Sequence, residues 1–273
     1  MFISAGIIAI SFISCGGGAT QEEIAKEKVN NDLAKLNLKG KVVRIQQNLY
    51  YLENENDELT EKNQERGEQI YHTLFYKDWN VIGEMSFYTS FEFRFDEKGN
   101  VVKVMQNRDI TYNFDDDIVI SETWKYEDVW SEKWMYKYDE ERLVSKKPTK
   151  DDDSPTFKYK YNDNGMLSKV TEEEKGEKKK EADLEYNNEG KIEKVQDYEF
   201  DNDGEKNNGR KIVFEYDENG NVSKMTISKG DDKIVLIFSK YKYDEQGNWI
   251  RRVIKRKDED YCIVIIRKIR YDD

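Results

Sequence analysis

The sequence predicts an all-β protein: a long antiparallel meander of hairpin repeats, curled into a large barrel-like or wrapped sheet and preceded by a short N-terminal helix. Three observations lead to this prediction. A short motif of aromatic, turn and glycine residues recurs along the chain, the segments between its copies alternate apolar with charged residues, and only 2 of the 273 residues are proline. Proline is rare inside paired strands because it lacks an amide hydrogen.

The composition limits the classes of function. Hydrophobic and charged residues each make up 37% of the chain and aromatic residues 13%, which is too much aromatic surface for a disordered chain. The formal net charge of −12 argues against a nucleic acid partner, because phosphate binding needs a basic face. With one histidine and two cysteines, most histidine-based catalytic and metal sites are ruled out, and we expect no cofactor.

Residues 1–14 form an uncharged apolar segment that ends beside Cys15 and a run of three glycines. Such a segment is too short to span a membrane as a helix and is typical of a secretory signal. The residues before Cys15 resemble the lipobox of bacterial lipoproteins, in which the signal is cut before a cysteine that then carries the lipid. The resemblance implies lipid on Cys15 and a location at the bacterial outer membrane, facing the periplasm or the cell surface. An ordinary cleaved signal and a buried segment of the fold are the alternatives.

Residues 15–37 are expected to form a flexible tether and a short helix. The glycines at 16–18 favour flexibility, and apolar residues between Ile24 and Leu36 recur with loosely helical spacing. The remaining residues, 38–273, are expected to form a single β domain.

An internal repeat organises this domain. Each intact copy reads aromatic or leucine, any residue, aromatic, Asp or Asn, two polar residues and glycine. The first three positions place two side chains on one face of a strand. The Asp or Asn begins a type I turn, and the glycine takes the positive φ that closes a three-residue hairpin. The predicted turn glycines are Gly99, Gly165, Gly190, Gly220 and Gly247, and a sixth copy carries Arg142 in place of glycine.

The hairpins predict about 14 strands of the usual length. An open twisted sheet of more than about ten strands normally closes, splits or flattens. Because the alternation gives one aromatic face and one Lys/Glu face, and the charged face must be solvated, the aromatic face is expected inside. Two strands, Ile234–Phe238 and Cys262–Ile266, are apolar at every position, so we expect both of their faces to be covered.

The motif Tyr-x-Tyr-Asp-x-x-Gly-Asn resembles the YD repeat of Rhs proteins, and its combination with a lipobox is similar to YD-repeat bacterial lipoproteins. The opening Leu38-Lys-Gly40-Lys-Val-Val-Arg-Ile45 also resembles the first strand of such domains. Rhs proteins form β-shells that enclose a toxin, and some related lipoprotein domains have a porin-like β fold. The resemblance covers residues 38–273 and implies a curled or barrel-like fold and no catalytic residue.

A weak calcium candidate lies in Asp201-Asn-Asp-Gly-Glu205, where Asp201, Asp203 and Glu205 supply carboxylates. A complete EF-hand loop needs a bidentate glutamate at its twelfth position, which this segment lacks. A structural turn is the alternative reading, although the segment lies outside the glycine repeat.

The densest aromatic feature runs from Trp124 to Tyr138. Aromatic rings that share a strand face are able to stack on sugar rings, but they also stabilise sheets through cross-strand pairs. The candidate platform and the alternative of an aromatic core use the same residues, which are Trp124, Tyr126, Trp130, Trp134, Tyr136 and Tyr138.

The sequence contains no nucleophile elbow, phosphate-binding loop or Cys/His metal spacing. We therefore expect a non-enzymatic, lipid-anchored envelope protein that acts as a binding or scaffold module and meets the membrane only through its anchor. The alternative is a carbohydrate-binding lipoprotein that uses the aromatic platform. A glycan or a protein is the expected partner.

Overall fold

The computed structural model describes residues 38–67, 92–97, 99, 101–104, 108–115, 118–126, 130–140, 142–149 and 155–272. Within these ranges the chain forms sixteen β-strands and one helical segment at 61–67. The predicted signal at 1–14, the lipidated Cys15 and the tether and helix at 15–37 lie outside the described residues. No helix in the described ranges has the length and apolarity that a membrane crossing requires.

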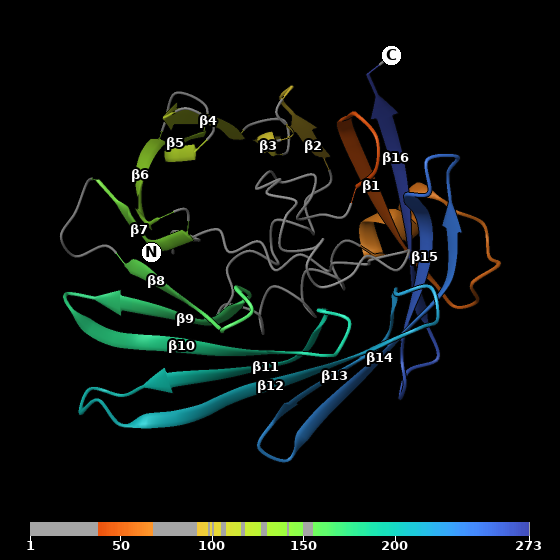
Figure 1. Ribbon diagram of the computed structural model, residues 1–273. Helices are drawn as coiled ribbons and strands as arrows, with labels where there is room; N and C mark the ends of the chain where they lie inside the picture. The colour runs from red at the N-terminus through yellow and green to blue at the C-terminus, as the bar shows by residue number, and fades with distance from the viewer. Residues whose placement is uncertain are drawn as a thin grey trace.

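The strands form one antiparallel meander (Figure 1). Their bounds are β1 Val42–Leu52, β2 Glu92–Phe95, β3 Val101–Val104, β4 Arg108–Asp115, β5 Ile118–Tyr126, β6 Trp130–Asp139, β7 Arg142–Pro148, β8 Thr156–Tyr161, β9 Leu167–Glu174, β10 Glu177–Tyr186, β11 Ile192–Phe200, β12 Lys206–Tyr216, β13 Val222–Lys229, β14 Asp232–Tyr243, β15 Trp249–Arg256 and β16 Cys262–Tyr271. The predicted all-β meander is thus confirmed.

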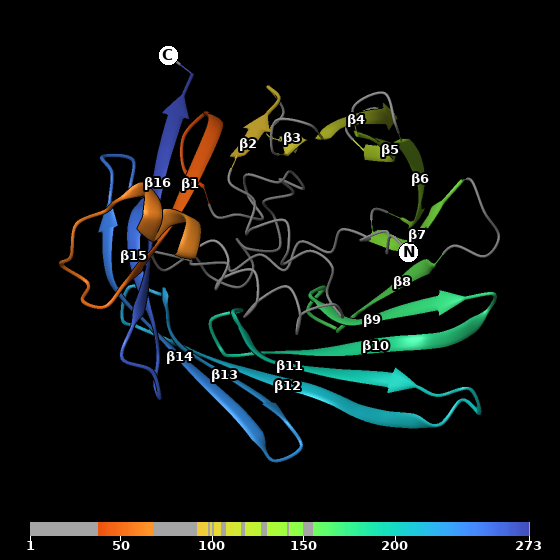
Figure 2. The same cartoon turned by 180° about the vertical axis from the view of Figure 1, so that it is seen from behind.

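The sheet curls so that its first and last strands lie side by side, which Figure 2 shows from behind. β1 pairs with β16 from Val42 opposite Tyr271 to Leu52 opposite Cys262. On its other side β1 pairs with β2 over only three residues, Arg44 to Gln46. The sheet is therefore barrel-like. The pairing of β1 with β2 is far shorter than its pairing with β16.

One face of the sheet carries the main hydrophobic core. Alternate residues of neighbouring strands belong to this cluster, such as Phe157 and Tyr159 of β8 and Ile212 and Phe214 of β12. The opposite face carries cross-strand ion pairs, including Lys194 with Glu185 and Lys224 with Glu215, each at 2.6 Å. Because charged groups need water, we call the core face inner and the charged face outer.

The repeat turns have the geometry that their residues predict. In the copy at 217–221 the Gly220 amide donates to the Asp217 carbonyl at 2.9 Å, and Oδ1 of Asp217 accepts from the amides of Asn219 and Asn221 at 3.0 and 2.8 Å. Gly220 has a φ of 80°, which residues with a Cβ adopt only at a cost. The other four turn glycines also have positive φ, between 75° and 80°.

The copy without glycine makes a tighter turn. Asp139 pairs directly with Arg142, so the hairpin has one residue fewer than the glycine turns. Glu140 takes a φ of 53°, in the left-handed region that glycine normally fills.

In five of the six copies of the repeat, a tyrosine hydroxyl ties the hairpin to the previous one. Tyr186 Oη donates to the Leu167 carbonyl at 2.7 Å, and Tyr216 Oη donates to the Ile192 carbonyl at 2.6 Å. We call these contacts the tyrosine ties; the residues that make them are Tyr138, Tyr161, Tyr186, Tyr216 and Tyr241. The ties explain why the second aromatic position of the motif favours tyrosine, while the first position, buried in the core, also accepts phenylalanine or leucine.

The last intact copy departs from this pattern because of a bulge in β14. The pairing of β14 with β15 shifts between Ser239 and Lys242, and Lys240 has a φ of 53°. As a result the first tyrosine of the copy, Tyr241, makes the tie, and the second, Tyr243, is 43% exposed.

Candidate functional site

The aromatic block predicted as a sugar platform lies on β5 and β6. Trp134 is 2% exposed and Trp124 9% exposed, and both belong to the main core. The Tyr138 hydroxyl makes the first tyrosine tie, to the Val119 carbonyl at 2.8 Å. Tyr126 and Trp130 pair at the ends of these strands, but their side chains lie outside the description.

A buried ion pair fixes the centre of this block. Lys146 of β7 donates to Glu122 of β5, and both side chains are 1% exposed. The Lys146 ammonium also lies 5.0 Å from the ring centroid of Trp134 and 5.2 Å from that of Tyr136, distances at which cations and aromatic rings attract. Burial, followed by the nearby Glu122 carboxylate, raises the pKa of Tyr136 well above its usual value.

This arrangement leaves little room for a sugar at the two indoles. A stacking platform needs an open ring face, whereas Trp124 and Trp134 are packed into the core. Trp124 and Trp134 therefore provide packing beside a buried charge pair.

The candidate calcium segment is a turn of the repeat type. The Gly204 amide donates to the Asp201 carbonyl at 3.1 Å, and Asp201 Oδ1 accepts from the amides of Asp203 and Glu205 at 3.0 and 2.9 Å. The segment thus has the geometry of the glycine turns, although its sequence position sets it apart from them. Across the described part of the chain, His, Cys, Asp and Glu form no group of three or more that is placed to hold a metal ion.

The outer face is covered at one place by apolar residues. Leu52, Val253, Cys262 and Val264 are at most 1% exposed and form a second cluster on β1, β15 and β16. The apolar run at Cys262–Ile266 is thus buried on both faces from Cys262 to Val264, as its sequence predicts. Cys262 is a free thiol, and burial raises its pKa.

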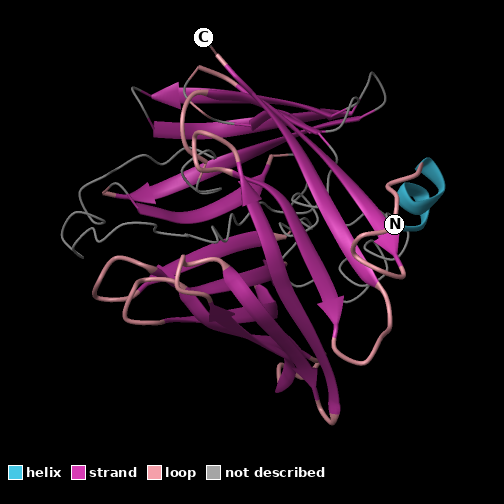
Figure 3. Cartoon of the chain, turned by 90° about the vertical axis from the view of Figure 1, so that its right-hand side faces the viewer, coloured by secondary structure: helices cyan, strands magenta, loops and turns pink. Residues whose placement is uncertain are grey.

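The segment after β1 lies beside this cluster. It contains the helical turn at 61–67, which Figure 3 shows beside the sheet rather than between its strands. Thr60 caps the helix, because its Oγ1 accepts from the Asn63 amide at 3.2 Å. The last described residue of this helical segment, Gly67, lies against β1, where an added Cβ would lie 2.6 Å from the Leu49 carbonyl oxygen.

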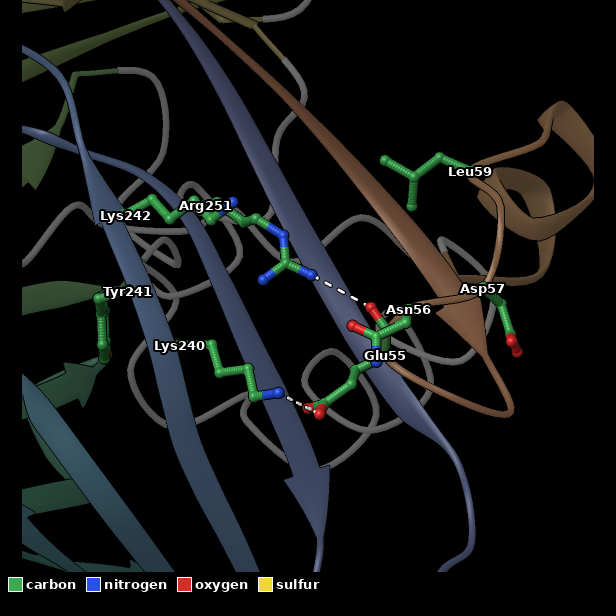
Figure 4. A pocket seen from close by; sticks show the side chains of 8 residues that line it. All are labelled: Glu55, Asn56, Asp57, Leu59, Lys240, Tyr241, Lys242 and Arg251. Carbon is green, nitrogen blue, oxygen red and sulfur yellow. Dashed lines mark hydrogen bonds and ion pairs between the residues drawn. The ribbon is translucent and has the colours of Figure 1, made fainter.

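A cavity of about 440 Å³ opens on the outer face between the loop at 53–59 and the sheet (Figure 4). We call this segment the Glu55 loop. The cavity is lined by Glu55, Asn56, Asp57 and Leu59 of the loop, by Lys240, Tyr241 and Lys242 of β14, and by Arg251 of β15. It is a candidate site on the described surface.

Cations of the sheet converge on Glu55. Its carboxylate accepts from Lys240 Nζ and lies 3.7 Å from Lys255 Nζ, and its carbonyl oxygen accepts from Arg251 Nη2 at 3.2 Å. Figure 4 shows the Lys240 and Arg251 contacts as dashed lines. The hydrogen bond from Lys240, and then the charges of Lys240, Lys255 and Arg251, hold the pKa of Glu55 below its usual 4.5.

Sequence reasoning did not find this site. Glu55 and Lys240 are 185 residues apart, and each sits among other charged residues that look like a solvated surface. The one local signal is the break in alternation at Ser239-Lys240-Tyr241, which marks the bulge.

Comparisons with known proteins show likeness of fold only. No family model and no curated protein matches the sequence. A porin-like protein from Bacteroides uniformis aligns with a TM-score of 0.49 and 7% identity, over 84% of this chain and 98% of its own. A porin-like protein from Bacteroides vulgatus aligns with a TM-score of 0.34 and 9% identity, over 66% of this chain and 93% of its own.

A toxin assembly is also distantly similar. The chain aligns to the TcdB2-TccC3-Cdc42 crystal structure with a TM-score of 0.34 and 9% identity, over 61% of this chain and 9% of that one. The chain therefore spans about a tenth of that protein.

Proposed function

We propose that this protein is a lipid-anchored component of the bacterial cell envelope that acts as a non-enzymatic binding or scaffold module. The observation that carries the proposal is the use of the repeat residues. The motif's aspartates and glycines close turns, its tyrosines tie hairpins and its lysines pair across strands. These residues hold the curled sheet together, so we assign partner binding to the outer face and the loops.

The anchor is tested by labelling. Cells that express the full chain are fed radioactive or alkynyl palmitate, and the protein is recovered by immunoprecipitation. We expect label on the wild type and none on Cys15→Ser, with processing of the wild type blocked by globomycin. An unlabelled wild type would remove the anchor and the envelope location from the proposal.

The second candidate function is carbohydrate binding by the aromatic block, which its density of rings favours. The test is a glycan array probed with the wild type, Trp124→Ala and Trp134→Ala. Because both indoles are buried, each variant also needs a circular-dichroism check of its fold. Equal signals from folded wild type and folded variants would exclude the indoles as a platform.

A further inference from the structure

The Glu55 loop occupies a site with more positive than negative charge. Lys240, Arg251 and Lys255 all contact this one residue, through its carboxylate or its carbonyl oxygen. The side chain of Asp57, the other acid of the cavity, already accepts from the Asn54 amide at 2.7 Å within the loop. Two ammonium groups at the carboxylate and a guanidinium at the carbonyl oxygen of the same residue are the donor set expected of a site for a carboxylate-bearing peptide.

The backbone of β14 is shaped to supply one of these cations. Leu236 and Phe238 point to the inner core, so strict alternation would place Lys240 on the inner face as well. The left-handed bulge at Lys240 instead brings its ammonium to Glu55 on the outer face. Lys240 thus holds a left-handed backbone conformation that only glycine adopts without cost. Backbone strain of this kind often accompanies functional sites.

The present occupant is a short acidic peptide segment. The Glu55 loop has the sequence Glu-Asn-Glu-Asn-Asp-Glu-Leu, and apart from Glu55 its residues are exposed. Leu59 is exposed at the rim of the same cavity. A peptide that carries a carboxylate and displaces this loop would find the three cations of β14 and β15 in the same place.

We infer that the Lys240–Arg251–Lys255 cluster is a binding site for an acidic peptide segment of a partner protein, and that Glu55 is its exchangeable internal occupant. The inference rests on the proposed function, because it names the partner class of the binding module. The net charge of −12 repels acidic partners at long range, but such repulsion is screened beyond about 8 Å at physiological salt. Recognition therefore depends on the local cations.

The test is a fluorescence-anisotropy titration of the purified full chain with a labelled peptide that has the sequence of residues 52–59. Glu55→Gln removes the internal carboxylate that competes with the peptide. If the wild-type loop fills the site in about 90% or more of the molecules, the variant should bind the peptide at least about tenfold more tightly than the wild type. Adding Arg251→Gln and Lys255→Gln to Glu55→Gln should abolish this gain in affinity. Salt at about 0.5 M, roughly three times the physiological level, should weaken binding because it screens the charges.

Two controls are matched to this design. Glu215→Gln breaks an exposed ion pair with Lys224 on the same outer face and should leave affinity unchanged. A peptide with its acids replaced by Gln and Asn should not bind. Equal affinities of wild type and Glu55→Gln, or equal binding of the amide peptide, would overturn the inference.

Other occupants give distinct results. Binding of citrate without binding of the peptide would assign the site to small anions and overturn the peptide assignment. Concentration-dependent dimers that Glu55→Gln abolishes would assign it to a second copy of this chain, with the same consequence. The titration needs no lipid, so failure of the palmitate test and failure of this one are distinguishable.

Discussion

Glu140 shows how a single backbone conformation departs from what its residue favours. It takes a φ of 53° in the one repeat copy that lacks glycine. A left-handed conformation costs a residue with a Cβ about 1–2 kcal/mol, and the short turn between Asp139 and Arg142 imposes it here.

Replacement of this residue by glycine should therefore stabilise the protein. For Glu140→Gly we expect the free energy of unfolding to rise by about 0.5–1 kcal/mol, since the relief of strain exceeds the entropy that glycine adds to the unfolded chain. Urea denaturation measures the change. The control is Glu245→Gly, in a glycine turn where the residue does not have positive φ, and there we expect a loss of similar size; a gain at both positions would contradict the assignment.

At the residue scale the sequence predicted which residues form turns, but not which distant side chains meet. The turn positions follow from local rules, because an Asp side chain and a glycine act on backbone groups within four residues. The cavity residues do not, because Glu55 meets Lys240 only after β1 and β14 take their places in the curled sheet.

At the scale of the element, the hairpins are held together by the tyrosine ties as well as by the strand ladder. Each tie joins the end of one strand to a carbonyl of the preceding hairpin, as Tyr186 joins Leu167 and Tyr161 joins Leu143. Burial raises the pKa of Tyr186 to about 12, so these hydroxyls keep their protons at neutral pH.

Removal of one tie should cost the energy of one part-buried hydrogen bond. For Tyr186→Phe we expect the free energy of unfolding to fall by about 1 kcal/mol, because the Leu167 carbonyl loses its donor. Thermal and urea unfolding both measure the loss. Tyr243→Phe is the matched control, since Tyr243 occupies the same motif position but is exposed and makes no tie to a carbonyl; equal losses in the two variants would show that the ties add nothing.

The sequence predicted the hairpins but not the ties. The alternation and the turn residues are local, so they reveal strands and turns directly. The acceptor of each tie lies 18–24 residues upstream, in a register that only the completed sheet defines.

For the molecule as a whole, the inner face buries charge as well as aromatic rings. Asp197 of β11 is 1% exposed and lies 3.6 Å from Arg210 Nε of β12, and neither carboxylate oxygen accepts a hydrogen bond within the described residues. Burial raises the pKa of Asp197 from 3.8 to about 6, although Arg210 opposes the shift.

The raised pKa makes stability depend on pH. The folded state favours the neutral carboxyl, so its contribution is complete below about pH 4 and is lost as the pH rises through about 6. The ionised form at pH 7 then costs up to about 3 kcal/mol, at 1.36 kcal/mol for each pKa unit.

Asp197→Asn keeps the neutral shape at every pH and should be more stable than the wild type at pH 7 by about 1–3 kcal/mol. At pH 4, just above the unfolded pKa of 3.8, the difference should shrink to about 0.5 kcal/mol. Urea unfolding at pH 4, 5, 6 and 7 gives the comparison. A variant that is less stable than the wild type at pH 7 would show that the Arg210 contact outweighs burial.

The sequence by itself determined the all-β class, the hairpin repeat, the turn at each repeat glycine and the two-sided burial of Cys262–Val264, because these depend on residues close together in the chain. The tertiary structure decided that β1 lies between β16 and β2, that Trp124 and Trp134 are packed in the core, and that Glu55 reaches the cations of β14 and β15. The physical reason is that curling brings together residues about 200 positions apart, and local patterns carry no information about such contacts.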